Sequence, residues 1–228
     1  KNYYKDISNK KSSRFNAILS MFEKSNKLEV LDYGCGWGCI SFALSSMGHK
    51  VQGIDLNSNE IQISKLVWGE NENLIFKNHE IGKFKESSFD RIISSQVIEH
   101  VHNVGNYLSE INRTLRDSGE LIITLPNIMT PRFIILNFRN SLFKKLNLLN
   151  KNIIKGFDKR DLHINSWDPL HFTHLISTLG FEIVEIKMAE GLPIPFLGYL
   201  NLPFLKNFRY TMCFKLKKVK NISIKSND

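Results

Sequence analysis

The feature that most constrains this chain is a cluster of glycines directly behind a hydrophobic stretch. Residues 30–38 read VLDYGCGWG, which places Gly34, Gly36 and Gly38 within five residues. Glycine adopts backbone angles that other residues avoid, and its missing side chain lets a ligand come close to the backbone. A glycine-rich turn between a strand and a helix also points amide N–H groups at such a ligand. The cluster therefore predicts a ligand-binding turn at the end of the first strand.

Segments typical of strands and of helices alternate around this turn. Hydrophobic runs indicate strands at 28–34, 50–56, 73–78, 89–97 and 121–127, and apolar periodicity indicates helices at 12–24, 39–48, 58–69 and 104–115. This alternation predicts an α/β fold, a doubly wound and mostly parallel sheet with helices on both faces. After a helix at 168–180, strands at 181–187 and 209–218 are expected to form the antiparallel edge of a seven-stranded sheet.

We expect a single domain over residues 1–228, because a chain of this length commonly forms one. Within it, residues 12–127 are expected to form the binding core, and 128–167 a helical lid or substrate insert. Residues 168–218 are expected to supply the C-terminal helix and the edge strands. The amphipathic stretch 131–157 has two interpretations, a lid that closes over the substrate or a helix that lies on a membrane surface.

The chain is basic, with 31 Lys and Arg residues against 22 Asp and Glu residues and a net charge of +9. Such a charge can indicate an anionic partner such as nucleic acid or a membrane surface. Much of the excess lies late in the chain and is predicted to form a solvated basic tail. Its members are Lys206, Arg209, Lys215, Lys217, Lys218, Lys220 and Lys225.

The sequence shows few signs of membrane targeting, disulfide bonds or metal binding. We expect neither a signal peptide nor a membrane-spanning helix, since no long uncharged apolar run occurs in the sequence. The three cysteines lack the paired spacing of a zinc site, which favours a reduced, cytoplasmic protein. His171 and His174 lie three residues apart, but no third ligand accompanies them, so we expect no metal site.

The spacing and charge around the glycines indicate which cofactor the turn binds. Dinucleotide sites use G-x-G-x-x-G, whereas here Cys39 stands in the place of the third glycine. Asp32, two residues before Gly34, would repel a pyrophosphate by about 1 kcal/mol at 4 Å even in water. The same carboxylate would favour a cationic ligand, and S-adenosylmethionine carries both an ammonium and a sulfonium group. Spacing and charge therefore both favour S-adenosylmethionine over NAD.

Asp55 ends the second predicted strand, nineteen residues after Gly36. A carboxylate at this place can accept hydrogen bonds from both ribose hydroxyls, which S-adenosylmethionine shares with NAD. Asp55 therefore indicates an adenosine without distinguishing the two cofactors. Alternatively, it is the acidic residue ahead of a helix that Ser58 caps.

Taken together, the segments VLDYGCGWG, GIDLN, FDRIISSQVIEHV and LRDSGELIITLPN resemble the class I S-adenosylmethionine-dependent methyltransferases. Within them the chain is most similar to the group containing the ubiquinone-biosynthesis O-methyltransferases. The resemblance implies a Rossmann-like methyltransferase fold with S-adenosylmethionine as cofactor. The cofactor-binding residues that it implies are Arg14, Asp32, Gly34, Cys35, Gly36, Gly38, Asp55, Leu56, Asn78, His79, Ser95 and Gln96.

The resemblance also implies roles for these positions. The glycine turn and Asp32 would surround the methionine part of the cofactor, and Arg14 would reach its carboxylate. Asp55 would hold the ribose and Leu56 would pack on the adenine, while Asn78 and His79 would meet the adenine edge. The segment Ser95–Gln96 would pass beneath the methionine. Asn78 departs from the family, which often has Asp at this place.

Methyl transfer requires an in-line approach of a nucleophile, and a hydroxyl acceptor is helped by a general base. Three residues qualify by their place after the strands. Glu99 and His100 follow the fourth strand in VIEHV, and His163 lies in the loop after the insert. We expect His163 to be the base. Glu99 and His100 either take part in catalysis or cap and brace the next helix.

The sequence thus predicts a methyltransferase that O-methylates a small molecule, such as a sugar or a cell-surface metabolite. Several alternatives stay open: a lipid or quinone precursor methylated at a membrane surface through 131–157, an amine as acceptor, or RNA. Against a nucleobase acceptor, the Asn/Asp-Pro-Pro-aromatic run that holds exocyclic amines is missing after the fourth strand. An NAD(P)-dependent oxidoreductase would require glycine at position 39 and no acid at position 32.

Overall fold

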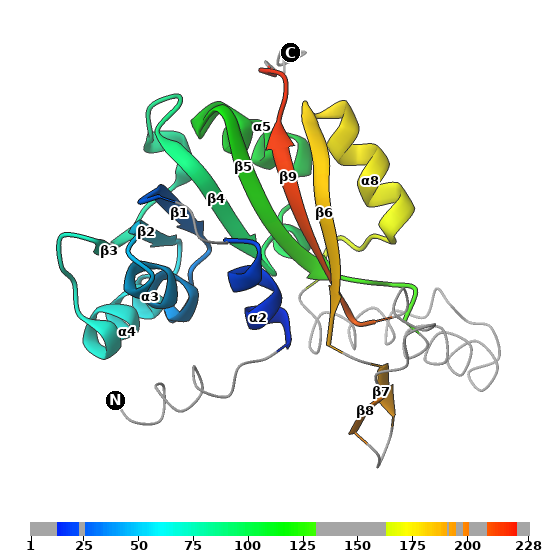
Figure 1. Cartoon of the computed structure of the whole chain (residues 1–228), viewed down its shortest axis with the longest axis horizontal. Helices are drawn as coiled ribbons and strands as arrows, with labels where there is room; N and C mark the ends of the chain where they lie inside the picture. Colours follow the sequence, from blue (N-terminus) through cyan, green and yellow to red (C-terminus); the bar gives the residue numbers. More distant parts are fainter. Residues whose placement is uncertain are drawn as a thin grey trace, which may run out of the picture.

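The computed structural model describes residues 13–22, 26–130, 163–190, 192–194, 198–200 and 209–222 of the chain. Its central sheet is built from β1 (Glu29–Tyr33), β2 (Lys50–Asp55), β3 (Leu74–Asn78), β4 (Phe89–Ser95), β5 (Leu115–Pro126), β6 (Phe181–Ala189) and β9 (Thr211–Lys218). These seven strands lie in the order β3-β2-β1-β4-β5-β9-β6 (Figure 1). The pairs from β3 across to β5 are parallel. The predicted seven-stranded, mostly parallel α/β fold is therefore confirmed.

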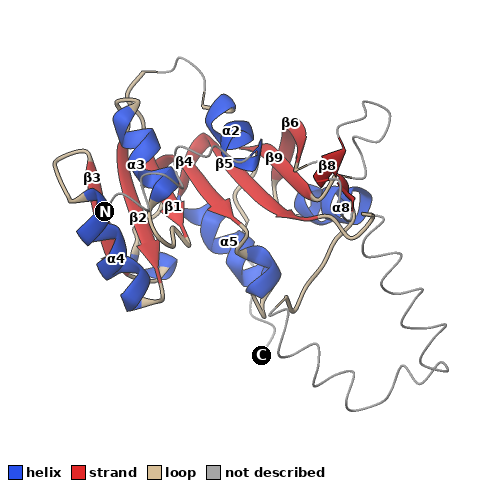
Figure 2. Cartoon of the chain, turned by 90° about the horizontal axis from the view of Figure 1, so that it is seen from below, coloured by secondary structure: helices blue, strands red, loops and turns tan. Residues whose placement is uncertain are grey.

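Helices cover both faces of this sheet (Figure 2). They are α2 (Ser13–Ser20), α3 (Cys39–Ser46), α4 (Ser58–Trp68), α5 (Val104–Thr114) and α8 (Pro169–Thr178), with short 3₁₀ turns η1 (Ile81–Lys83) and η2 (Ile98–His100). None of the helices within these described segments is long and apolar enough to cross a membrane. The stretch 131–157, predicted as a lid or a membrane-surface helix, lies outside the described residues.

Successive residues of the central strands pack alternately into two hydrophobic cores, one on each face of the sheet. In β4, Ile92 packs into the core formed with α5 and α8, whereas its neighbour Ile93 packs into the core formed with α2, α3 and α4. In β5, Leu121 and Ile123 face the first core, and Ile122 faces the second. Strands buried on both faces need continuous hydrophobic runs, which explains why these segments do not alternate with polar residues.

The antiparallel end of the sheet is formed by the last described strand. β9 pairs antiparallel with β5 on one side and with β6 on the other. The expected antiparallel edge is confirmed, and its order is now defined, since β6 is the outermost strand and β9 lies inside it. The proline-containing stretch before β9 also holds a small hairpin, β7 (Leu192–Ile194) and β8 (Gly198–Leu200).

The prediction of a solvated basic tail is wrong for Lys215 and Lys218, which lie in β9, whereas Lys217 of the same strand is exposed. The Lys215 ammonium is 3.2 Å from a carboxylate oxygen of Glu120. Lys218 is buried, and its ammonium donates a hydrogen bond to the carbonyl of Leu115 at 2.8 Å. Both residues belong to a strand inside the sheet, where their aliphatic stems pack and their charged ends find acceptors.

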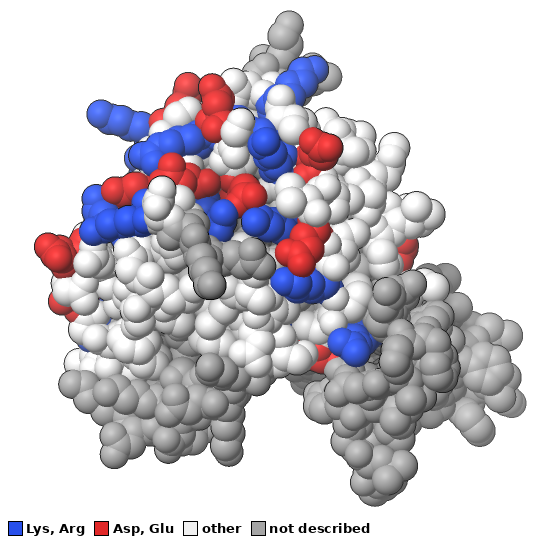
Figure 3. Space-filling view, viewed as in Figure 1, with Lys and Arg blue, Asp and Glu red and all other residues white. Residues whose placement is uncertain are grey.

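Opposite charges are intermingled on the face of the molecule drawn in Figure 3. Figure 3 shows Lys and Arg side chains beside Asp and Glu over the upper part of the view. Ion pairs also join neighbouring strands, since Arg91 of β4 pairs with Glu120 of β5, and Lys215 of β9 pairs with the same glutamate. The excess of positive charge therefore does not form one continuous basic patch on this face.

Two local boundaries differ from the sequence prediction. The helix α4 is capped by Asn57 rather than Ser58, and the Asn57 side chain accepts a hydrogen bond from the Asn59 N–H. Strand β5 starts at Leu115 and takes in residues 116–120, ahead of the strand predicted at 121–127. A register shift against β4 and a positive φ of 59° at Ser118 accommodate these extra residues, as in a β-bulge.

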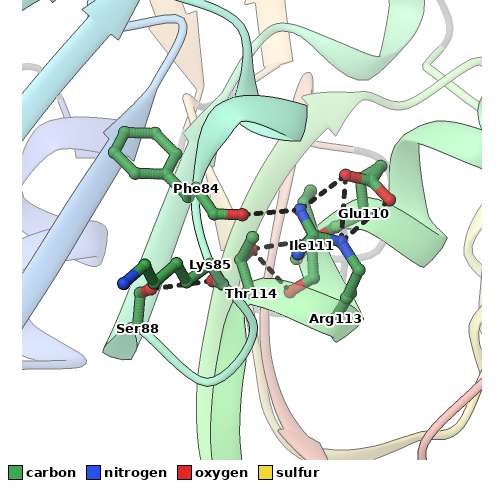
Figure 4. Close-up of polar contacts among 7 residues, drawn as sticks. All are labelled: Phe84, Lys85, Ser88, Glu110, Ile111, Arg113 and Thr114. Atoms are coloured by element: carbon green, nitrogen blue, oxygen red, sulfur yellow. Dashed lines mark hydrogen bonds and ion pairs between the residues drawn. The ribbon is translucent and has the colours of Figure 1, made fainter.

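A polar clamp joins the end of α5 to the loop before β4 (Figure 4). Arg113 donates to both carboxylate oxygens of Glu110, and it also donates to the carbonyl of Phe84 at 2.9 Å. The backbone N–H of Ser87 donates to the Arg113 carbonyl at 3.0 Å, and that of Ser88 donates to the Thr114 carbonyl at 2.9 Å. The clamp fixes the loop that leads into the central strand β4.

We expect Arg113→Met to lower the free energy of unfolding by about 1–2 kcal/mol, because the Phe84 carbonyl and the Glu110 carboxylate lose a charged donor. Arg116→Met is the matched control. It removes an arginine whose side chain is 42% exposed in its pair with Asp90, so its effect should stay below about 0.5 kcal/mol. Urea unfolding at pH 7 measures both. Equal losses in the two variants would contradict the role of the clamp.

Candidate active site

The glycine turn after β1 is built from three left-handed backbone positions. Gly34, Gly36 and Gly38 have φ angles of 75°, 50° and 74°. A Cβ on Gly34 would lie 2.4 Å from Val97 Cγ2, and one on Gly38 would lie 2.6 Å from Phe76 Cε1. A Cβ on Gly36 would meet no atom within 4 Å. Two of the glycines are therefore required by packing, and the third presents its backbone to open space.

The end of β2 holds this turn in place. The Gly36 N–H donates to Asp55 Oδ2 at 3.0 Å, and the backbone N–H groups of Gly34 and Cys35 both donate to the Ile54 carbonyl at 2.9 Å. Asp55 Oδ1 accepts from the Asn57 N–H at 2.8 Å. Asp55 thus lies at the start of α4, as one interpretation of the sequence had it, and it also orders the turn.

Residues expected near an adenine lie at the ends of β2 and β3. The Asn78 amide donates to the carbonyls of Asp55 and Leu56, both at 2.9 Å. Leu56 is 68% exposed, so its side chain is available to cover a flat ligand. The His79 ring packs edge-on against Phe84 with centroids 5.1 Å apart. Asn78 therefore fixes the backbone that carries Asp55 and Leu56.

Asp32 is buried beneath the turn. Its Oδ2 accepts a hydrogen bond from the Ser41 hydroxyl at 2.6 Å. Burial raises the pKa of Asp32 to about 6, although the hydroxyl and backbone N–H of Ser41 lower it in part. The nearby charge of Asp55 raises it further. Asp32 thus supports the turn from below by bracing the start of α3.

Cys35 and Cys39 are not reactive thiols in this environment. Burial raises the pKa of the Cys35 thiol, and the negative charges of Asp32 and Asp55 raise it further. Burial and Asp32 act in the same direction on the pKa of Cys39. Because only a thiolate is a good nucleophile or metal ligand, neither residue is suited to those roles at neutral pH.

The end of β4 is held by a residue that the sequence analysis did not single out. Thr124 of β5 accepts a hydrogen bond from the Gln96 N–H at its carbonyl, at 2.9 Å, and from the Gln96 amide at its hydroxyl, at 3.3 Å. Its hydroxyl also lies 3.0 Å from the Ser95 hydroxyl. Gln96 has a φ of 59°, which is unusual for a residue other than glycine and requires such support. The place of Thr124 near the carboxyl end of a central strand was the available signal.

Arg14 of α2 lies near Glu190, which follows β6, and near Glu99, which follows β4. Its guanidinium lies 3.8 Å from a carboxylate oxygen of Glu190, whose other oxygen accepts from the Thr211 hydroxyl at 2.7 Å. The positive charge of Arg14 also lowers the pKa of Glu99, against the larger effect of burial, which raises it. Arg14 is thus close enough to interact electrostatically with the residues that follow β4.

The three predicted catalytic residues lie together. One ligating atom each from Glu99, His100 and His163 lies within 4.8 Å of the others, and we call this group the Glu99–His100–His163 cluster. The imidazole rings of His100 and His163 are 4.9 Å apart at an angle of 66°. That Glu99 or His100 caps the next helix is wrong, because Asn103 caps α5 by accepting from the Asn106 N–H, whereas a bracing role stays a prediction.

Backbone hydrogen bonds bring the distant His163 to this place. The N–H groups of Ile164 and Asn165 both donate to the Glu99 carbonyl, at 2.8 and 3.1 Å. The side-chain amide of Asn165 donates to the Val101 carbonyl. Residues 163–165 are therefore fixed beside η2, more than sixty positions earlier in the chain.

The arrangement suits S-adenosylmethionine. Open space beside Gly36 admits a ligand next to the backbone, and the Asp55 carboxylate stands at the rim of the turn, where it can accept hydroxyl protons. Exposed Leu56 offers an apolar surface on one side. These features match the ribose, adenine and methionine parts of a nucleoside cofactor, and the fold and site define an S-adenosylmethionine-dependent methyltransferase.

Comparison with known proteins agrees. A family model described as a methyltransferase domain matches residues 8–186, so the chain belongs to this methyltransferase family, in class I of the S-adenosylmethionine-dependent enzymes. The uncharacterized protein MJ1252 of Methanocaldococcus jannaschii is 32% identical over 198 residues, covering 84% of this chain and 76% of that protein. A ubiquinone biosynthesis O-methyltransferase of Rickettsia canadensis is 28% identical, covering 75% of this chain and 69% of that protein.

A solved structure shows the same fold. The magnesium protoporphyrin IX methyltransferase of Synechocystis, with bound SAH, superposes with a TM-score of 0.61 at 17% identity. The match covers 89% of this chain and 79% of that one. At this identity the likeness concerns the fold, whereas the family match identifies S-adenosylmethionine as the cofactor.

The buried Asp32 carboxyl makes stability depend on pH. Its pKa is about 6 in the folded chain against an ordinary value of 3.8 for an aspartic acid, so the folded state holds an extra proton between these values. Its contribution to the free energy of unfolding therefore falls by roughly 3 kcal/mol as pH rises from about 4 to about 6. The Asp32→Asn side chain resembles the protonated carboxyl and does not titrate. Over the same rise in pH, its free energy of unfolding should therefore increase by a similar amount relative to that of the native chain. Urea unfolding at several pH values measures the difference, and parallel profiles would contradict it.

Proposed function

We propose that this methyltransferase transfers a methyl group to a hydroxyl oxygen of a small molecule, such as a sugar or another cell-surface metabolite. The observation that carries the proposal is the Glu99–His100–His163 cluster, which lies just beyond the end of β4. Ligands of open parallel sheets bind outside the carboxyl ends of the strands, and β4 is a central strand. A carboxylate and two imidazoles at this place can bind a hydroxyl and remove its proton.

Each residue has a distinct part in the proposed site. Asp55 accepts the ribose hydroxyls, Asn78 and Leu56 border the adenine, and Arg14 attracts the cofactor carboxylate. S-adenosylmethionine supplies a methyl group on a positively charged sulfur. His163 accepts the proton of the acceptor hydroxyl, while His100 packs against its ring and orients it. The backbone bonds to the Glu99 carbonyl keep His163 at a fixed place.

A phenolic acceptor such as a quinone precursor is the second candidate. It is supported by the ubiquinone biosynthesis O-methyltransferase of Rickettsia canadensis, 28% identical to this chain. RNA as acceptor has less support, because acidic side chains interrupt the basic ones on the face drawn in Figure 3. We propose that the enzyme acts in the cytoplasm, where free thiols such as those of Cys35, Cys39 and Cys213 stay reduced.

Asp55→Ala tests the cofactor site. We expect the variant to bind S-adenosylmethionine about a hundredfold more weakly in calorimetry, because the ribose loses a charged acceptor and the Gly36 N–H loses its partner. Asp117→Ala removes a carboxylate that is 87% exposed and lies near the start of β5. This control should bind normally. Absence of binding by the native chain, or equal binding by Asp55→Ala, would count against the assignment.

His163→Ala tests the acceptor side. With an acceptor found by screening hydroxylated sugars and phenols, turnover should fall by about 10²–10⁴-fold, because the hydroxyl keeps its proton. Affinity for S-adenosylmethionine should stay unchanged. His171→Ala is the control, since His171 is an exposed residue paired with Asp168. Full turnover in His163→Ala would exclude this histidine as the base.

A further inference from the structure

The Glu99 side chain is buried, and its carboxylate has no hydrogen-bond partner among the residues that the structure describes. Only 1% of this residue is exposed, and neither carboxylate oxygen accepts a hydrogen bond from any residue that the structure describes. A buried carboxylate without hydrogen bonds is costly, so buried charges are usually paired or bound to a metal ion. The side chain is therefore arranged to meet a group that protein atoms in the described segments do not supply.

Two imidazoles adjoin this carboxylate in a geometry that suits one shared ion. Ligating atoms of Glu99, His100 and His163 lie within 4.8 Å of one another. Ligands of a four-coordinate zinc ion stand roughly 3.3 Å apart, so small side-chain rotations bring all three into range. Two rings bound to one ion through a nitrogen each have centroids roughly 5 Å apart. The observed separation of the His100 and His163 rings is 4.9 Å.

The backbone around the cluster is fixed before any ion binds. The Ile164 and Asn165 N–H groups donate hydrogen bonds to the Glu99 carbonyl, and the Asn165 side-chain amide donates one to the Val101 carbonyl. On the other side, the Ile128 N–H donates to the Trp167 carbonyl at 3.2 Å. These contacts come from three separate parts of the chain, so the positions of the ligands are set by the fold and not by a local motif.

We propose that Glu99, His100 and His163 bind one divalent transition-metal ion, with Zn²⁺ the best match to the ligands. Two histidines and one glutamate form the ligand set of catalytic zinc sites, which keep a fourth position open for water or substrate. Imidazole ligands disfavour Mg²⁺ and Ca²⁺, which prefer oxygen. The sequence analysis expected no metal site because it sought ligands close together in the chain, whereas His163 lies more than sixty residues after Glu99.

This inference deepens the proposed function, on which its catalytic part rests. The ion binds the acceptor oxygen at its open position and lowers the pKa of that hydroxyl, so the proton leaves to water. The O–CH₃ bond then forms as the S–CH₃ bond breaks, and the electron pair of the broken bond stays on sulfur. A His163 nitrogen that binds the ion cannot accept this proton. With the ion bound, proton removal therefore depends on the ion, and the base role proposed for His163 applies to the enzyme without the ion.

Metal binding is measured on the full chain, after treatment with a chelator and dialysis. Calorimetric titration with Zn²⁺ alone should show one ion per chain. Titration with Co²⁺, whose visible absorption reports nitrogen and oxygen ligands, should give a saturating band. Glu99→Gln and His163→Gln should each weaken Zn²⁺ binding by about tenfold or more. The matched control is His171→Gln, which removes an exposed histidine beside Asp168 and should bind Zn²⁺ as the native chain does.

Several outcomes would overturn the metal site. These are no bound Zn²⁺ in the native chain, equal binding by Glu99→Gln and His163→Gln, or loss of binding in His171→Gln, which would reveal a surface site. S-adenosylmethionine titration of every variant shows that it is folded, and it tests the proposed function separately. Cofactor binding without Zn²⁺ binding removes the metal alone, whereas Zn²⁺ binding without cofactor binding removes the proposed function alone.

Discussion

The hydrogen bond between the Gly36 N–H and the Asp55 carboxylate is the contact on which the site depends. It joins the turn after β1 to the end of β2, so two neighbouring strands end in one continuous polar surface. The turn can bend this sharply because Gly34 and Gly38 take left-handed angles where a side chain would strike Val97 or Phe76. Val97 follows β4, so a third strand end is packed into the same surface.

The two halves of the sheet contribute different parts of the enzyme. The parallel half carries the residues expected to hold the cofactor, at the ends of β1, β2, β3 and β4. The half that contains β5, β9 and β6 supplies supports, such as Thr124 beneath Gln96 and Glu190 beside Arg14. The loop before α8 then brings His163 to the residues that follow β4. The residues proposed to bind the methyl donor and the acceptor therefore lie near each other where the two halves join.

Much of this could be predicted from the sequence, and the rest could not for physical reasons. The strands and helices follow from local hydrophobic patterns, and the glycine turn from backbone geometry that few other residues allow. The position of β9 inside β6 depends on pairing between residues far apart in the chain, which no local pattern encodes. For the same reason the sequence analysis assigned Lys215 and Lys218 to a basic tail, although their partners Glu120 and Leu115 lie in β5.

The candidate site shows the same division. Asp32, Asp55 and the glycines were found because each stands at a strand end within a compact motif. The proximity of His163 to Glu99 was suggested only by topology, since the contacts that create it are backbone bonds of Ile164 and Asn165. Within the described part of the chain the Glu99 carboxylate accepts no hydrogen bond, and this depends on three-dimensional burial that a sequence does not display.

The position of β9 between β5 and β6 has a consequence during synthesis on the ribosome. Both of its neighbours emerge earlier, yet β6 has no place in the sheet until residues 211–218 arrive. For that interval β5 presents an open strand edge flanked by Leu121 and Ile123, the kind of edge that pairs with other chains. The nascent polypeptide is thus most vulnerable to aggregation shortly before the insertion of its final described strand.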